Sequence, residues 1–281
     1  LLLAARIYFE HKKNKIAFRI LHKAEKLALS FDIYAILNEI YHTKIQYAHL
    51  SPNIRLNEVI SQSRVNLAYF IQEQQLNMAY ATIKEQLKKL PQRDISTIIS
   101  DAFSSYDIEV SKALTYKSLF QLMHLTTAAA TMQRNYHSIT PFMNNLYEVI
   151  SEKNMLAEKH LYYHIASLHL MAVTYFRNKD FKNSAQFTAK MEIEMRKQHQ
   201  KYYARFEEKH HLINALNLHY TGSPEQAINT LQKLKTHSLN SELTLIMFLF
   251  QQEQWSPANQ RLQKLNHSDR WYEKKAGLVW V

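Results

Sequence analysis

The sequence predicts an all-α fold in which short connections join many helices. Glycine is nearly absent: Gly222 and Gly277 are the only two in 281 residues, against about 7% in an average globular chain. Tight sheet turns and phosphate-binding loops depend on glycine, so both are hard to build here. Strand-like alternation is missing, and apolar residues recur at helical spacing instead, which predicts roughly thirteen to fifteen helices.

Four of the five prolines follow a residue that caps helix N-termini, and each such dipeptide predicts a helix start. A serine or threonine oxygen can accept a hydrogen bond from a first-turn amide, while proline just inside has no amide to leave unpaired. Gln226 strengthens the third signal, because it stands three residues after Ser223 as in a capping box. Pro91 instead indicates a helix end, with Asp94 as the next cap. The four start signals are Ser51-Pro52, Thr140-Pro141, Ser223-Pro224 and Ser256-Pro257.

Between these signals, apolar stripes define the buried helix faces. The segment that comes nearest to a linker is 100–107, which is too short and too apolar to separate independent domains. We therefore expect one continuous array, with unphased repeats in residues 1–154 and recognisable helix pairs in 155–281. Two of the stripes are Ile16, Ile20, Leu21, Ala24, Leu27 and Ala28, and Leu114, Leu119, Leu122, Met123, Leu125 and Ala129.

Three helix pairs are predicted in residues 155–281, with turns at 178–181, 221–224 and 253–255. Small residues occur where the helices of a pair must pack closely. The first pair has Leu168, Ala172 and Tyr175 before its turn and Ser184, Phe187 and Met191 after it; the second has Ala215 and Leu218, then Ala227, Leu231 and Leu234; the third has Ile246 and Leu249, then Ala258, Leu262 and Leu265.

This pattern resembles the tetratricopeptide (TPR) repeat, which has a small residue in each helix and an aromatic or similar side chain after the turn. The match is degenerate. Ser184, Ala227 and Ala258 are separated by 43 and 31 residues, where the family repeats every 34, and Ile246 stands where a small residue is expected. The resemblance implies an α-solenoid whose first helices line a concave surface for a peptide or protein partner. A helical bundle that happens to contain hairpins is the alternative.

The resemblance also implies which residues contact the partner. Arg177 and Lys209 could pair with carboxylates while aromatic side chains act as anchors, so an acidic or amphipathic segment is expected. His169 and Val173 stand where some TPR domains carry the lysine and asparagine that clamp a terminal carboxylate, which argues against binding of a chaperone tail. The alternative is that these side chains merely pack between successive first helices. The predicted contact residues are His169, Phe176, Arg177, Lys209, His219, Tyr220, Asn240 and Gln251.

The formal net charge of +11 raises the possibility of nucleic-acid binding. The distribution argues against it, because lysine outnumbers arginine and the lysines are scattered as on solvated helix faces. The run 201–206 mixes cations with aromatics, but helical spacing places Tyr202 and Phe206 together on a buried face. No apolar run approaches the roughly 20 residues that cross a bilayer.

Catalytic and metal chemistry find little support in the sequence. With no cysteine, thiolate metal sites and cysteine nucleophiles are excluded, and no known catalytic or phosphate-binding motif occurs. His160 and His164 are four residues apart, and three Glu-x-x-His pairs have the spacing of di-metal bundles; composition accounts for most of these coincidences. We predict no cofactor and no metal site. The three pairs are Glu39 with His42, Glu207 with His210, and Glu208 with His211.

The leading hypothesis is therefore a non-enzymatic scaffold for protein–protein interaction. One alternative is a TPR-like regulatory module of a transcription or signalling protein whose effector domain lies outside these residues, because both ends of the sequence suggest a longer protein. A metal-dependent helical-bundle enzyme is the second alternative. A cytoplasmic location is expected, and the apolar start at 1–5 leaves a processed signal peptide open. The sequence gives no oligomeric state.

Overall fold

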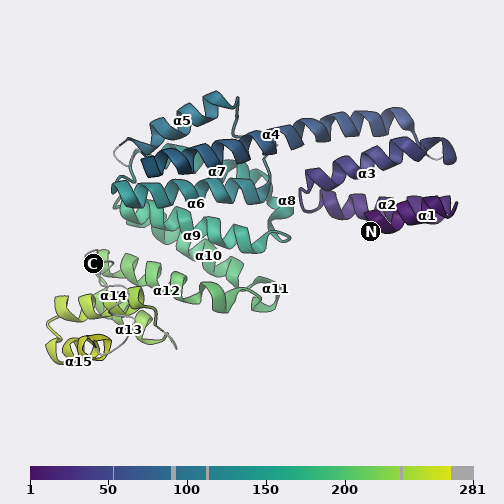
Figure 1. Cartoon of the computed structure of the whole chain (residues 1–281). Coiled ribbons are helices and arrows are strands. Elements are labelled where there is room, and N and C mark those ends of the chain that lie inside the picture. Colours follow the sequence, from purple (N-terminus) through teal and green to yellow (C-terminus); the bar gives the residue numbers. More distant parts are fainter. Residues whose placement is uncertain (53, 90–92, 112–113, 235–236, 267–281) are drawn as a thin grey trace. The chain divides into compact units, whose positions relative to one another are not determined.

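The computed structural model describes residues 1–52, 54–89, 93–111, 114–234 and 237–266 (Figure 1). All regular structure in these ranges is helical, which confirms the all-α prediction for them. The helices are labelled α1 to α15, and one 3-10 turn, η1 (Ala48–Leu50), follows α3. The chain divides into two compact units, Leu1–His164 and Ile165–Val281.

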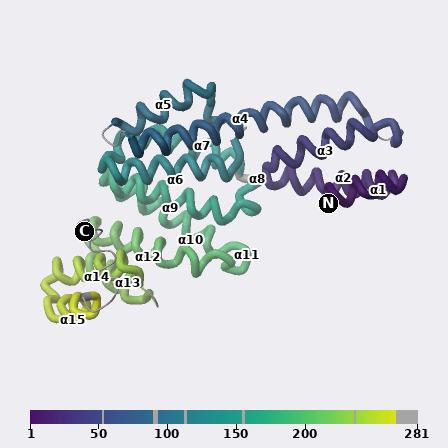
Figure 2. Tube along the Cα trace, in the orientation of Figure 1, coloured from purple at the N-terminus to yellow at the C-terminus, as the bar shows by residue number. Residues whose placement is uncertain are grey.

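The first unit is built on the long helix α4, which packs against α3, α5 and α6. Neighbouring helices α1, α2 and α3 pack on one another and lie beside the first part of α4 (Figure 2). Leu21, Leu37 and Ile40 are almost completely buried among them. The helices are α1 (Leu2–Glu10), α2 (Asn14–Leu29), α3 (Tyr34–Tyr47), α4 (Leu56–Lys89), α5 (Ile95–Ser105), α6 (Tyr116–Gln133), α7 (Thr140–Glu152) and α8 (Asn154–Ala157), and α9 (Leu161–Arg177) begins here.

The second unit contains helices joined by connections at 178–180, 221–223 and 252–254, the last of which begins one residue earlier than the predicted turn. In the first pair the small residues do meet, because Ser184 Oγ donates to the carbonyl oxygen of Ala172 at 2.9 Å. Ala215, Ala227 and Ala258 are completely buried in the core of the next two pairs. Beyond α9, the helices are α10 (Phe181–Met195), α11 (Lys197–Gln200), α12 (Tyr203–Tyr220), α13 (Pro224–Gln232), α14 (Leu239–Gln251) and α15 (Trp255–Asn266).

Two of the predicted N-caps are at the first residue before their helix. The carboxylate of Asp94 accepts hydrogen bonds from the amides of Ser96 at 3.0 Å and Thr97 at 3.4 Å, so this cap is confirmed. Ser223 precedes α13 with Pro224 in its first turn, yet its side chain makes no capping hydrogen bond. The helix start was thus predicted correctly, while the capping-box contact was wrong.

The other proline signals were misplaced by one to several residues. Thr140 already lies within α7, and its hydroxyl donates to the carbonyl oxygen of Tyr136 at 2.9 Å instead of accepting from the first turn. Ser51 follows η1, and α4 begins only at Leu56. At the last signal, α15 begins at Trp255, one residue before the expected cap. Pro91 lies outside the described residues.

The segment that we expected to come nearest to a linker is mostly helical. Helix α5 extends to Ser105, whose hydroxyl donates to the carbonyl oxygen of Asp101 at 2.7 Å. The buried side chains of Ile98, Ile99 and Ala102 hold this helix on its neighbours, so the serines are on its exposed face. Residues 100–105 thus belong to a packed helix, and the division between the two units does not fall in this segment. Among the described residues, no helix is long and apolar enough to cross a membrane.

Candidate functional site

The eight predicted contact residues all belong to the second unit and to the first helix of each pair. Helix α9 carries His169, Phe176 and Arg177; α12 carries Lys209, His219 and Tyr220; and α14 carries Asn240 and Gln251. Helices α12 and α14 contact each other directly, and α12 also packs on α10. The structure brings several of these side chains together in groups, which are described in turn.

An aromatic cluster forms where α9 and α12 end. The Phe176 ring lies 5.6 Å from the Tyr220 ring, and Phe181, at the start of α10, is within 5.6 Å of both. Phe181 and Tyr220 are stacked with an interplanar angle of 9°, yet half of the Tyr220 surface remains exposed. Phe181 was not predicted as a site residue, although its place directly after the turn was the available signal.

His219 and Gln251 join α12 to α14. The His219 ring stacks on the fully buried Phe248 ring at 4.2 Å between centroids. Burial lowers the pKa of His219, and a hydrogen bond with the Gln251 side chain acts in the opposite direction. His219 and Gln251 thus pack between successive first helices, as the alternative to partner contact expected for all eight predicted contact residues.

His169 is the most strongly perturbed titratable group of this surface. Burial, followed by the positive charge of Lys209 and the neighbouring His210, lowers the pKa of His169 to about 4. The imidazole is therefore neutral at pH 7, and its buried Nδ1 has no hydrogen-bond partner in the described part of the chain. Lys209 itself is exposed, with its ammonium 5.8 Å from the centre of the Phe206 ring, and Phe206 is buried as predicted.

Two cations on these first helices have no carboxylate partner among the described residues. Arg177 and Lys209 are both exposed, and neither makes an ion pair with a described residue. Some other cations of the second unit do pair locally, for example Arg196 with Glu192 at 2.6 Å. Asn240 is exposed in the first turn of α14, where its carbonyl oxygen accepts a hydrogen bond from Thr244.

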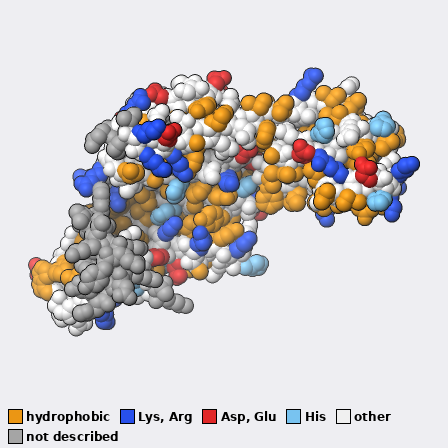
Figure 3. All heavy atoms as spheres, viewed as in Figure 1, with side chains coloured by type: hydrophobic (Ala, Val, Ile, Leu, Met, Phe, Trp, Pro, Cys, Tyr) orange, Lys and Arg blue, Asp and Glu red, His pale blue; other side chains and the backbone are white. Residues whose placement is uncertain are grey.

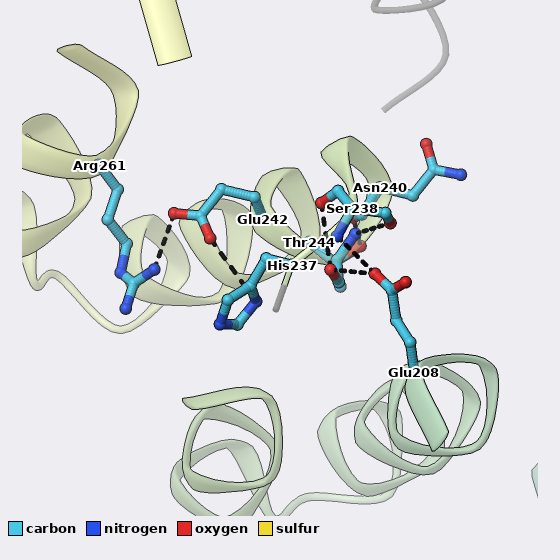
Figure 4. Close-up of polar contacts among 8 residues, drawn as sticks. Glu208, His237, Ser238, Asn240, Glu242, Thr244 and Arg261 are labelled. Atoms are coloured by element: carbon cyan, nitrogen blue, oxygen red, sulfur yellow. Dashed lines mark hydrogen bonds and ion pairs between the residues drawn. The ribbon is translucent and has the colours of Figure 1, made fainter. Parts of the chain in front are cut away.

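Glu208 anchors α14 to α12, a role that the sequence did not indicate (Figure 4). Its Oε1 accepts hydrogen bonds from the Ser238 amide and the Ser241 hydroxyl, both at 2.6 Å. Burial alone would raise the pKa of Glu208, but the hydrogen bonds from Ser238 and Ser241 outweigh it and the pKa is lowered. On α14, Glu242 pairs with Arg261 of α15 at 2.7 Å, which adds a polar contact within the third pair.

The histidine and glutamate pairs with metal-ligand spacing have other partners. His164 Nδ1 lies 2.5 Å from the Tyr116 hydroxyl oxygen, and the His160 ring stacks on Tyr116. Glu39 pairs with Arg6 at 2.5 Å, and Glu208 binds the start of α14. Within the described ranges, no three His, Cys, Asp or Glu side chains are grouped so that they could hold a metal ion.

Comparison with protein-family models, curated proteins and solved structures found no match to this chain. The geometry of the described residues is therefore the basis for assigning a function. That geometry provides a surface with exposed aromatic rings and two unpaired cations on the first helices of the second unit.

Proposed function

We propose that the protein is a non-enzymatic interaction module that binds an acidic or amphipathic peptide or protein segment along α9, α12 and α14. The observation that carries the proposal is the exposure of aromatic rings close to the ends of these helices. Tyr220 is 50% exposed, Phe250 37% and Trp255 58%, and the rings of Phe250 and Trp255 lie 5.6 Å apart. Exposed aromatic groups of this kind are typical anchors of protein interfaces.

The unpaired cations define the chemistry of the expected partner. Arg177 and Lys209 make no ion pair with a described residue, so a carboxylate of a partner can approach either without displacing an internal acid. Such pairs at an interface mainly determine orientation, selectivity and the rate of association, while aromatic contacts supply most of the affinity. A partner with alternating acidic and apolar residues satisfies both features.

A TPR-like α-solenoid is the organisation that we propose for the second unit. Three consecutive helix pairs with completely buried small residues support it, because small residues allow the close helix approach on which repeat stacking depends. These residues are Ala172 and Ser184 in the first pair, Ala215 and Ala227 in the second, and Ala258 in the third. We also propose a cytoplasmic location. The proposed role involves neither a cofactor nor catalysis.

Affinity capture from nuclease-treated lysate tests the proposal, followed by reduction of each captured protein to its shortest binding segment. The test variant is Arg177→Glu with Lys209→Glu. The control is Lys233→Glu with Lys264→Glu, which changes the same charge at exposed positions at the end of α13 and on α15. Both variants are first checked for unchanged helix content by circular dichroism.

We expect the dissociation constant of the segment to rise at least about tenfold in the test variant and less than about twofold in the control. Tyr220→Ala should also weaken binding of this segment, because it removes the half-exposed aromatic anchor. Equal weakening in both charge variants would show that only net charge matters. Loss of all capture on nuclease treatment would favour nucleic acid and contradict the proposal.

A further inference from the structure

A second surface with unpaired cations lies in the first unit, between α2, α3 and the start of α4. A cavity of about 860 Å³ opens there, within the range of ligand-binding clefts. Over these helices, cationic and histidine side chains lie among hydrophobic ones (Figure 3). None of the features used for the proposed function belongs to this unit, so the cavity is argued independently.

Basic side chains dominate the charge of the cavity. Lys15, Arg19 and His22 follow one another on α2 at spacings of four and three residues, which places them on one helix face. Lys44 of α3 and Arg55, just before α4, complete the basic lining. This arrangement concentrates positive charge in one concave region of a chain whose cations are otherwise scattered.

Only two of these cations are neutralised from within. Lys44 pairs with Glu25 at 2.6 Å, with both side chains largely buried, and Arg55 pairs with the exposed Glu58 at 2.9 Å. Lys15 and Arg19 make no ion pair with any residue that the structure describes. Among lysine, arginine and glutamate, four positive and two negative side chains line the cavity, a difference of two positive charges.

The same cavity has an apolar floor. Phe18 packs edge-on against Phe9 at 4.9 Å, and Phe18 and Ile54 both lie against the core of the first unit while remaining partly accessible. Leu50 adds a third apolar side chain, which is 40% exposed. A ligand that fits the cavity must therefore cover apolar surface as well as neutralise charge.

We infer that this cavity binds an acidic peptide segment in which an apolar side chain lies between carboxylates. The apolar side chain would cover Phe18 and Ile54, and the flanking carboxylates would pair with Lys15 and Arg19. A small inorganic anion would leave the floor in contact with water and would meet the carboxylate of Glu25 if it entered deeply. A basic segment is excluded because the excess positive charge of the cavity would repel it.

The test uses fluorescein-labelled short peptides with a central leucine and two glutamates on each side, compared with peptides that carry glutamine in place of glutamate. Binding to the full chain is followed by fluorescence anisotropy at low and at physiological ionic strength. The test variant is Lys15→Gln with Arg19→Gln. The control is Lys23→Gln with Lys26→Gln, which removes the same charge from exposed positions of the same helix outside the cavity.

We expect the glutamate peptide to bind. Its dissociation constant should rise about tenfold in the test variant and change less than about twofold in the control variant. Replacement of the central leucine of the peptide by glycine should also weaken binding, and it leaves the protein unchanged. The inference is overturned if glutamine peptides bind equally well, if both variants weaken binding equally, or if no glutamate peptide binds. Binding of pyrophosphate in place of the peptide would identify a simple anion site and would overturn it as well.

Discussion

Replacing Glu208 tests how α14 is fixed to α12. One carboxylate oxygen of Glu208 receives two hydrogen bonds of 2.6 Å, from the Ser238 amide and the Ser241 hydroxyl. The donors are Ser238, the N-cap residue of α14, and Ser241 in its first turn, and free amides and the helix dipole favour a negative charge at this end of the helix. Glu208→Ala removes the acceptor, and Glu208→Gln keeps an oxygen but removes the charge.

The size of the effect follows from these contacts. A hydrogen bond to a charged group contributes about 1.5–3 kcal/mol, and partial exposure of Glu208 reduces this because water can replace the lost acceptor. We expect Glu208→Ala to lower the free energy of unfolding by about 2 kcal/mol and Glu208→Gln by about 1 kcal/mol. Because the pKa of Glu208 is lowered in the folded state, this stabilisation is present above the ordinary carboxyl pKa and is lost as the pH falls through the folded value.

Tryptophan fluorescence provides a selective assay. In a background that carries Trp271→Phe and Trp280→Phe, the remaining tryptophan is Trp255, which begins α15 in the second unit. Its fluorescence during urea unfolding then reports this unit, whereas circular dichroism reports both. Glu207→Gln is the matched control, because it removes the same charge one residue earlier and the Glu207 side chain has no hydrogen bond to a described residue. A loss below about 0.5 kcal/mol for Glu208→Ala, or an equal loss for Glu207→Gln, would refute the anchoring argument.

Three further predictions concern packing, pH and capping. Ser184 is completely buried against the Ala172 carbonyl, so Ser184→Leu should destabilise the second unit by about 3 kcal/mol and Ser184→Ala by about 1 kcal/mol. If the variants and the wild type had equal midpoints of urea unfolding measured by fluorescence, close packing at this position would be contradicted. Because His169 binds its proton near pH 6.5 when unfolded but only near pH 4 when folded, stability should fall by about 2 kcal/mol between pH 7 and pH 5, and a fall that is undiminished in His169→Gln would contradict this. Asp94→Ala should destabilise the first unit by about 1 kcal/mol in urea unfolding followed by circular dichroism, with Asp94→Asn close to wild type; an equal loss in both would mean that the cap is unimportant.

The helix pairs of the second unit could be predicted because their signals are local. Asp180 caps α10 by accepting a hydrogen bond from the Asn183 amide at 3.1 Å, and Lys179 before it adopts a positive φ of 62° that ends the preceding helix. The failures have local causes too. The hydroxyl of Thr140 satisfies the Tyr136 carbonyl in place of a first-turn amide, and residue type alone does not decide between these two partners.

The contacts that determine the site were harder to predict because they join residues far apart in the chain. Glu208 meets Ser238 and Ser241 across 30 and 33 positions, and a glutamate next to histidines gave only the spacing of a metal pair. Periodicity identifies the buried face of a helix but does not say which partner that face contacts. For this reason His219 was grouped with the exposed contact residues, although its ring stacks on the buried Phe248.

Charge acquires functional meaning only when the internal ion pairs are known. A net charge of +11 does not separate a solvated helix face from a binding surface, because both contain lysine and arginine. In the structure, Lys44 and Arg261 are paired with glutamates, whereas Lys15 and Arg19 in the first unit and Arg177 in the second have no such partner among the described residues. A paired cation already has a carboxylate that offsets the free-energy cost of removing it from water. An acidic partner therefore gains most affinity at an unpaired cation that lies beside exposed apolar groups.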